Sequence, residues 1–557
     1  METINLSLVL TLFGFFLSGL PIFRLFQIKN WLFPRVLADY FSLKGKNYFL
    51  NKKDILVLIF VLYLLLGLEN YLHLFFTLFN LWFNLIFEIA SFIFPLLPSL
   101  AEFLTLNSLS LLFLVLTLGL FLIRLPLLKN IQITPKALIL LFLFLFLNFS
   151  FIYLSKNDPL IVALIFISYF QIAFFVLALM LFEILVSPYL WLLRRRVERK
   201  LKKLEIKKIV IVGSYGKSSL KEILVYLLQN KKILSLPPRI NHEYSILKFL
   251  LRQKLENYDY LVLELGSYFL GNIAWLTKAI IPDYVFITGI TKQHYFLFGE
   301  RMENVIWAEG LEALQWMKKG KVFINSNHEY FAKLKEEIEK NFKNKELKII
   351  TYGKQGDYSY EILSSELEKT IFKLKIGEDS HLLETNLFYP PQIENLVGAL
   401  TFVLEEKILN LEEISEKIKN ISLPSTFLQV KFIKNFVIFD DSYNANLKGV
   451  IEGLKYFQEL NLDKKIVIFN GLLELGRETK KIYRELAQLF QNLDVLVLTQ
   501  PEEYHFFKKL IPQKVFFPRK QEDLDNFLEK FKEKTGIFIF NRFPRGLKLK
   551  LGNEKTD

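Results

Sequence analysis

The chain changes character at residue 193, and this change limits its possible folds more than any other feature. The first 193 residues hold apolar runs close to the roughly 20 residues that a helix needs to cross a bilayer. The runs are Ile4–Ile22, Ile55–Leu68 continuing through Leu72–Leu100, Leu109–Ile123, Ala137–Leu154 and Leu160–Leu193. No basic stretch precedes the first run, so a cleaved signal peptide explains it poorly. We expect residues 1–193 to form an all-α polytopic membrane domain.

Positive charge gathers directly after the last apolar run. Residues 194–208 (RRRVERKLKKLEIKK) carry nine Lys/Arg against two Asp/Glu, which is half of the formal net charge of +14. This basic juxtamembrane linker is typical of the cytoplasmic side of a membrane and not of a groove for nucleic acid. Charges in the preceding loops then predict about five spans, with six as the alternative. The expected location is the cell (cytoplasmic) membrane, multi-pass, with residues 209–557 in the cytoplasm and no nucleic-acid partner.

The composition narrows the chemistry. The chain has no cysteine and only six histidines, so disulfides, zinc ribbons and thiol nucleophiles are excluded. Any reaction must use carboxylates, lysines, hydroxyls, backbone amides and a histidine or two.

After residue 208, short β-branched runs alternate with amphipathic charged stretches, which is typical of parallel α/β sheets. The expected strands are Ile209–Val212, Tyr260–Leu265, Tyr284–Thr288 and Lys321–Asn325, then Phe436–Asp440, Lys465–Asn470, Asp494–Leu498 and Ile537–Phe540. We therefore expect a P-loop ATP-binding central domain with a parallel sheet at 209–425. An α/β Rossmann-like C-terminal domain is expected at 426–557.

The first of these strands leads into a glycine turn and a helical stretch, the order that cradles phosphates. The expected nucleotide-binding residues of this loop are Gly213, Ser214, Tyr215, Gly216, Lys217, Ser218 and Ser219. In such loops the lysine reaches the β- and γ-phosphates and the following hydroxyl binds Mg²⁺. The loop is shorter than the usual G-x-x-x-x-G-K-[ST] motif.

The short loop resembles the G-T-N-G-K-[ST]-[ST] loop of the Mur ligases, ATP-dependent amide ligases of peptidoglycan precursor synthesis. Further matches follow in order: the segment Asn241–Glu243, Glu264 in an E-L-G sequence, His294 before Phe298-Gly299, and Asn325. Asp440–Asn446 (DDSYNAN) resembles the branch that adds a D-Ala-D-Ala dipeptide, as do Gly471 and Glu474–Gly476. The resemblance covers about residues 207–557.

The resemblance implies a mechanism and a set of roles. ATP would phosphorylate a substrate carboxylate, and an amine would attack the acyl phosphate to form an amide. Lys217 would hold the γ-phosphate, and Ser218, Glu264 and His294 would place Mg²⁺. Asn395 falls where family members have an Asn near the adenine of ATP. Three residues of the C-terminal domain would close over the nucleotide: Asp440, Tyr443 and Asn444.

One family residue is replaced. Mur ligases carry a carbamylated lysine that helps to hold a second Mg²⁺, and here Ala308-Glu309 falls on its Ala-Lys pair. The resemblance thus implies that Glu309 is a catalytic residue whose carboxylate helps to hold the metal. A glutamate carries this charge permanently, so no CO₂ would be required. Glu312, three positions on along the expected helix face, is the competing candidate.

The family's uridine-nucleotide-binding domain is missing, and the expected membrane domain occupies its place. The favoured function is a membrane-anchored amide ligase that joins a small-molecule or lipid-linked cell-wall precursor to an amino acid or dipeptide. The alternatives are a different amide ligase on the same scaffold, similar to poly-γ-glutamate synthase, and a non-catalytic ATP-binding membrane scaffold.

Overall fold

The computed structural model describes residues 139–140 and 160–549, apart from short gaps within the second range. The gaps are residues 238, 239, 241, 368, 425, 426, 443–445, 473, 474, 476, 477 and 542–546. The chain divides into two compact units, and residues 190–557 belong to the second. The predicted spans up to Leu154 lie outside the described residues apart from residues 139–140, so the membrane domain stays a prediction.

The described chain begins with one long helix, α8 (Leu160–Leu201), which carries Pro188 in its interior. The predicted basic linker is therefore helical as far as Leu201. Among the residues that the structure describes, no helix combines the length and the apolarity needed to cross a membrane.

The first sheet of the second unit has nine strands in the order β2-β3-β1-β4-β5-β6-β7-β8-β9. Strands β1 to β7 pair in parallel. The parallel strands before β7 are β1 (Lys207–Val212), β2 (Ile233–Ser235), β3 (Tyr260–Glu264), β4 (Tyr284–Ile287), β5 (Lys319–Asn325) and β6 (Glu346–Tyr352). Because β1 lies between β3 and β4, the loops that leave the carboxyl ends of these three strands meet at one edge, where α/β sheets bind ligands.

Helices connect these strands and bury their apolar sides against the sheet. They are α9 (Lys217–Leu227), α10 (Glu243–Arg252), α11 (Asn272–Ile280), α12 (Met302–Glu309), α13 (Phe331–Phe342), α14 (Pro390–Glu405) and α15 (Leu411–Ile418), with 3-10 turns η2 (Leu255–Asn257), η3 (Lys292–Phe298) and η4 (Leu311–Leu314). Leu220, Ile223 and Leu224 of α9 are fully buried with Val262 of β3 and Phe402 of α14 in one core. This packing fixes the start of α9 beside the end of β1.

The far edge of the first sheet was not predicted. Strands β7 (Tyr358–Glu366), β8 (Lys369–Ile376) and β9 (Asp379–Thr385) form an antiparallel meander. Burial alternates along β8, where Phe372 and Leu374 are buried and their neighbours are more exposed. This period of two is typical of a sheet with one solvated face.

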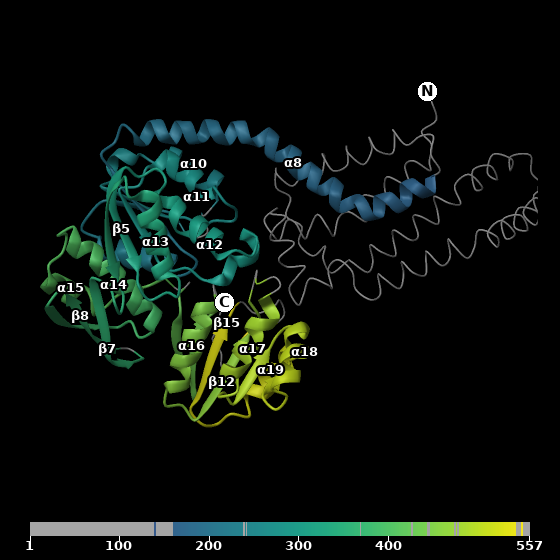
Figure 1. Cartoon of the computed structure of the whole chain (residues 1–557). Helices are drawn as coiled ribbons and strands as arrows, with labels where there is room; N and C mark the ends of the chain where they lie inside the picture. The colour runs from purple at the N-terminus through teal and green to yellow at the C-terminus, as the bar shows by residue number, and fades with distance from the viewer. Residues whose placement is uncertain are drawn as a thin grey trace, which may run out of the picture. The chain divides into compact units, whose positions relative to one another are not determined.

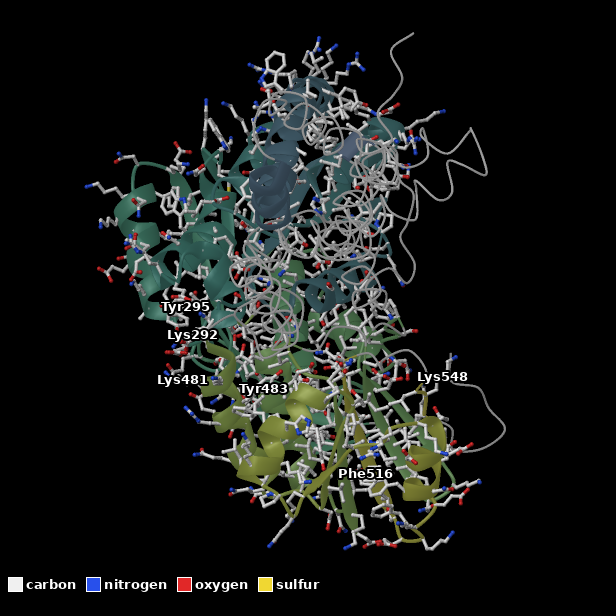
Figure 2. All side chains as sticks on the ribbon, turned by 90° about the vertical axis from the view of Figure 1, so that its right-hand side faces the viewer. Lys292, Tyr295, Lys481, Tyr483, Phe516 and Lys548 are labelled. Carbon is white, nitrogen blue, oxygen red and sulfur yellow. The ribbon has the colours of Figure 1, made fainter. Side chains whose placement is uncertain are left out.

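The second sheet has six strands in the order β10-β11-β15-β12-β13-β14. Its strands are β10 (Gln429–Ile433), β11 (Phe436–Asp441), β12 (Lys464–Phe469), β13 (Val495–Leu498), β14 (Val515–Phe516) and β15 (Thr535–Phe540), and its helices are α16 (Leu447–Glu459), α17 (Thr479–Phe490), α18 (Pro501–Leu510) and α19 (Gln521–Leu528). All pairs are parallel except β10 with β11. Figure 1 shows β12 and β15 side by side with these helices around them. Phe516 of β14, labelled in Figure 2, stacks on Phe527 of α19 with ring centroids 4.2 Å apart.

All eight predicted strands are present within one or two residues of their predicted bounds. The prediction of α/β folding with parallel sheets after residue 208 is therefore confirmed. The boundary at 425 between two domains stays a prediction, since both sheets belong to one compact unit.

Candidate active site

Strand β1 ends in a turn that requires glycine. Gly213 has a φ of +132° and Gly216 a φ of +79°, values that strain any residue with a side chain. A Cβ on Gly213 would lie 2.4 Å from Oγ1 of Thr288, and one on Gly216 would lie 2.9 Å from Oδ1 of Asn395. The turn thus leads directly into the amino end of α9, whose backbone amides and dipole favour a phosphate.

A cation, a hydroxyl and a carboxylate meet at this turn. The ammonium of Lys217, the first residue of α9, donates to the carbonyl oxygens of Gly213 and, at 3.5 Å, Ser214. The hydroxyl of Ser218 donates to Oε1 of Glu264 at 2.6 Å, and Glu264 ends β3 beside β1. The structure therefore brings together three residues that the sequence assigned to phosphate and Mg²⁺.

A second lysine behind this group was not predicted. Lys221 is buried one turn after Lys217, and its ammonium lies 3.8 Å from Oε2 of Glu264 and 3.0 Å from Oε1 of Glu222. It also donates to the carbonyl oxygen of Leu236 at 3.0 Å. The spacing of four residues after Lys217 on a helix was the available signal. Lys221 balances the charge of Glu264 from inside the fold.

Buried Glu309 and partly buried His294 form a pair beside Ser214 of the loop. Nδ1 of His294 lies 2.6 Å from Oε1 of Glu309, while Ser214 donates its hydroxyl to Oε2 of the same carboxylate. His294 belongs to the turn η3, whose Lys292 and Tyr295 are labelled in Figure 2. Burial raises the pKa of Glu309, but His294, Lys217 and Ser214 outweigh it and hold the pKa below its ordinary value.

The competing candidate, Glu312, has a different task. The two glutamates were expected to share a helix face, and that expectation is wrong because α12 ends at Glu309. The carboxylate of Glu312 instead accepts backbone N–H groups of Gly271, Ile273 (3.0 Å) and Ala274 (3.2 Å) at the amino end of α11. Glu312 therefore caps a helix, and Glu309 is the carboxylate that faces the phosphate loop.

Tyr215 forms part of the wall of the loop. Its ring lies against Gly289, where a Cβ would be only 2.3 Å from Cζ of the tyrosine. The backbone N–H of Ser214 also donates to the carbonyl oxygen of Gly289 at 2.7 Å. The loop after β4 thus supports the phosphate loop, and Gly289 is a residue that sequence reasoning missed.

A pocket opens above the loop and receives residues from both sheets. It is lined by Ser214, Tyr215, Gly216, Lys217, Ser218, Ser219, Glu264, Tyr389, Pro391, Gln392, Asn395, Phe427, Leu428, Asp441, Asn446, Lys448 and Gly449. Asn395 thus lines the pocket, and its amide donates to the carbonyl oxygen of Pro391 at 2.9 Å. Loop, carboxylate and helix end surround a space suited to a nucleotide.

The two adjacent aspartates at the end of β11 are placed differently. Asp440 does not line the pocket; its Oδ2 lies 3.4 Å from the ammonium of Lys431 on the neighbouring strand β10. Asp441 lines it instead, because successive side chains of β11 point to opposite faces. Burial, with the charge of Asp440, raises the pKa of Asp441 to about 7.

Other predicted residues are partly placed. Asn325 is buried at the end of β5, where its amide donates to the carbonyl oxygen of Thr288 at 2.6 Å and to Glu394. Asn325 therefore holds the loop that carries Thr288 and does not line the pocket. Asn241, Tyr443, Asn444 and Glu474 lie outside the described residues.

The donors fit Mg²⁺ as a companion of a bound triphosphate. Within the described part of the chain, no three His, Asp or Glu side chains cluster as a self-sufficient metal site. Mg²⁺ needs no such cage, because one or two carboxylates together with phosphate oxygens and waters satisfy it. Ser218 and Glu264, 2.6 Å apart beside Lys217, supply that kind of donor set.

The strand, glycine turn and helix with Lys217 and Ser218 define a nucleotide-binding α/β domain of the P-loop type. Residues 211–403 match the family described as Mur ligase middle domain. This part of the chain is therefore similar to a Mur ligase middle domain, and the protein is an enzyme, an ATP-dependent ligase that forms carbon–nitrogen bonds.

Curated relatives extend the likeness beyond this domain. The chain is 24% identical over 379 residues to a UDP-N-acetylmuramoyl-tripeptide–D-alanyl-D-alanine ligase of Rickettsia prowazekii, covering 66% of this chain and 81% of that one. It is 26% identical over 310 residues to the protein of the same name from Haemophilus influenzae, covering 53% of this chain and 64% of that one.

Solved structures show the same fold. MurF from Acinetobacter baumannii aligns with a TM-score of 0.56 at 21% identity, over 64% of this chain and 77% of that one. MurF ligase from Thermotoga maritima, solved in complex with ADP, aligns with a TM-score of 0.55 at 20% identity, over 63% and 80% of the two chains.

Proposed function

We propose that this protein is a membrane-anchored ligase that activates the carboxylate of a cell-wall precursor with ATP and joins it to D-alanyl-D-alanine. The observation that carries the proposal is the hydrogen bond of 2.6 Å between Ser218 and Glu264 beside the ammonium of Lys217. Support for the dipeptide comes from curated relatives named UDP-N-acetylmuramoyl-tripeptide–D-alanyl-D-alanine ligase.

The reaction needs two bond exchanges. An oxygen of the substrate carboxylate attacks the γ-phosphorus of ATP, the bond to the β-phosphate oxygen breaks, and ADP leaves. The amine nitrogen of the dipeptide then attacks the acyl carbon, the bond from that carbon to the phosphate oxygen breaks, and the nitrogen loses a proton as the amide forms. Neither exchange requires a covalent link to the enzyme, in keeping with a chain without cysteine.

The residues of the pocket act by position and charge. Lys217 releases its loop carbonyl oxygens and binds the β- and γ-phosphates, and the amides of the turn and of α9 bind the same oxygens. Ser218 and Glu264 would hold Mg²⁺, which would supply positive charge against the phosphate oxygens. Glu309 and His294 would supply a further carboxylate and imidazole next to Ser214, and the resemblance aligns Glu309 with the carbamylated lysine of family members.

The acceptor and the location belong to the same proposal. We infer that the ligase residues face the cytoplasm at a membrane, where they take either the soluble uridine-linked tripeptide or a lipid-linked precursor. The basic residues 194–208 directly after an apolar run support this orientation. A reporter fused after Asp557 should be active only if it is of the type that works in the cytoplasm. Activity of an exported reporter there would contradict both the orientation and the use of ATP.

One assay tests the reaction. The purified chain is incubated with ATP, Mg²⁺ and pairs of acceptor and amine, and phosphate release is measured together with the mass of the product. The muramoyl tripeptide with D-alanyl-D-alanine should stimulate release and yield the amide. Release with glutamate instead of the dipeptide would indicate a different amide ligase. Absence of turnover with every pair would indicate an ATP-binding scaffold, against the proposal.

A further inference from the structure

A band of large apolar side chains is exposed on helix α8. Ile184 and Leu185 are 66% and 65% exposed, and Tyr189, Trp191 and Leu192 are 51%, 46% and 49% exposed. Five such residues within nine positions are not the scattered single exposures of an ordinary protein surface. This apolar band requires an occupant.

Basic residues follow the apolar band on the same helix. Arg195, Arg196 and Arg199 are exposed, and the guanidinium of Arg195 lies 5.3 Å from the ring centroid of Trp191. The order along α8 is therefore aliphatic, aromatic and then cationic. Proteins show this order where a helix passes from acyl chains through the headgroups of an anionic leaflet.

The basic part of α8 is fastened to the domain that carries the phosphate loop. Arg194 is buried, and its guanidinium lies 4.7 Å from the ring centroid of Trp275 on α11. The ammonium of Lys200 donates to backbone carbonyl oxygens at the end of α10, including that of Leu250 at 3.4 Å. The cationic segment therefore keeps a fixed place on the domain.

A second pair of the same chemistry joins Lys278 of α11 to Trp316, which follows the turn η4. Lys278 is three positions after Trp275 and so shares its side of the helix. Its ammonium lies 4.4 Å from the ring centroid of Trp316, which is 40% exposed. A cation of α11, the helix that contacts Arg194 of α8, thus also lies against an aromatic ring.

We propose that the apolar band and the exposed arginines of α8 rest on an anionic lipid bilayer. Ile184 and Leu185 enter the acyl-chain region, Tyr189 and Trp191 lie among the headgroups, and the three arginines bind lipid phosphates. Charge favours this occupant over a second copy of the chain, since two copies would bring like-charged arginines together. The inference rests on the proposed membrane location and adds the residues and the depth at which the chain meets the lipid.

The absence of cysteine from the chain permits a direct test with single spin labels. Leu185→Cys, Trp191→Cys and Arg196→Cys are labelled in the full chain and placed in nanodiscs that contain phosphatidylglycerol. Leu382→Cys and Leu363→Cys, at sites 67% and 54% exposed on β9 and β7, are the matched controls. Accessibility to oxygen, which partitions into lipid, is compared with accessibility to a water-soluble nickel chelate.

The ratio of oxygen accessibility to nickel accessibility should be at least several-fold higher for the label at 185 than for the controls. The ratio at 191 should be intermediate, and the ratio at 196 should resemble that of the controls. Equal nickel accessibility at 185 and 382 would overturn the inference. If the chain still remained with the nanodiscs in that case, its membrane location would stand without this surface. Dipolar broadening at 185 that disappears on dilution with unlabelled chain would indicate self-association instead, and would also overturn it.

The charge contribution has its own test. A label at Leu192→Cys should be less mobile in phosphatidylglycerol than in phosphatidylcholine nanodiscs. In a chain that also carries Arg195→Gln, Arg196→Gln and Arg199→Gln this difference should vanish, whereas Lys369→Gln, an exposed control on β8, should leave it unchanged. A difference that survives the triple replacement would show that the arginines do not bind lipid phosphate.

Discussion

The imidazole of His294 lies 2.6 Å from the carboxylate of Glu309, measured from Nδ1 to Oε1, and this carboxylate contacts Ser214 of the phosphate loop. Ser214 of the loop donates its hydroxyl to the other oxygen of this carboxylate, and the backbone N–H of Thr291 donates to the Ser214 hydroxyl at 2.9 Å. The carboxylate therefore links the turn that carries His294 to the loop that faces phosphate.

Replacing Glu309 should raise the Mg²⁺ concentration that turnover requires, and this requirement should not depend on CO₂. Glu309→Gln keeps the shape and removes the charge, so the Mg²⁺ concentration for half-maximal turnover should rise and turnover should fall. Added bicarbonate should change the magnesium dependence of neither the parent nor the variant, because a glutamate needs no carbamylation. Magnesium titrations with and without bicarbonate measure both effects. An unchanged magnesium curve would remove Glu309 from the metal site.

Glu312 provides the contrast. Glu312→Gln weakens the cap of α11 and should cost about 1 kcal/mol of stability, the usual size of a lost cap. It should leave the magnesium curve as it was, because this carboxylate binds backbone N–H groups of α11. Thermal unfolding and magnesium titration of the same preparation separate the two effects. A shifted magnesium curve with unchanged unfolding would contradict this assignment.

Lys217 should be essential for turnover. Lys217→Ala removes the ammonium at the start of α9, and phosphate release should fall on the order of 10³-fold, as for other charge clamps on phosphoryl groups. Lys419→Ala, which removes an exposed lysine paired with Glu416, serves as the control and should retain full activity. Turnover of Lys217→Ala at the parent rate would reject the ATP site.

Gly289 should tolerate no side chain while Tyr215 is present. Gly289→Ala places a methyl group 2.3 Å from Cζ of Tyr215, so it should destabilise the chain by about 1–3 kcal/mol, as overpacking does. The KM for ATP should rise because the phosphate loop must shift. The double variant Gly289→Ala with Tyr215→Ser should regain much of the lost stability and of the KM for ATP. The double-mutant cycle then gives the interaction energy between the two residues. Additive losses would show that the two residues do not interact.

Asp441 should make the protein less stable as the pH rises. Its pKa is raised from the ordinary 3.8 to about 7, so between these values the unfolded chain has released a proton that the folded chain still holds. Stability is therefore lost from about pH 4 upward until pH 7 is passed. Asp441→Asn should melt at a higher temperature than the parent at pH 8, and the difference should vanish near pH 4.

The neighbouring aspartate checks the cause of this shift. Burial and the charge of Asp440 raise the pKa of Asp441, so Asp440→Asn should narrow the pH range over which stability is lost. Thermal unfolding from pH 4 to pH 8 measures it for each variant. A parent whose melting temperature differs from that of Asp441→Asn by a constant amount at every pH would contradict the raised pKa.

The parallel core was predictable because its strands are buried on both faces and read as unbroken apolar runs, such as Ile209–Val212. Strand β8 escaped prediction because buried Phe372 and Leu374 alternate with lysines. The phosphate loop was predictable because its residues are consecutive, so local order fixes their geometry.

Contacts between side chains far apart in the sequence were harder to predict. The sequence placed Asp440 in the pocket, yet only the pairing of β11 with β10, and hence the bond to Lys431, decides which of two adjacent aspartates faces inward. The sequence likewise left Glu309 and Glu312 as rivals on one helix. The helix ends between them, and only the position of α11 gives Glu312 its partners.

The hydroxyl of Tyr389 donates to the carbonyl oxygen of Gly449 at 2.7 Å, which joins the start of α14 to the start of α16. These two helices contribute Asn395 and Lys448 to the pocket. A nucleotide in the pocket would therefore contact two helices that the Tyr389 hydroxyl already holds together.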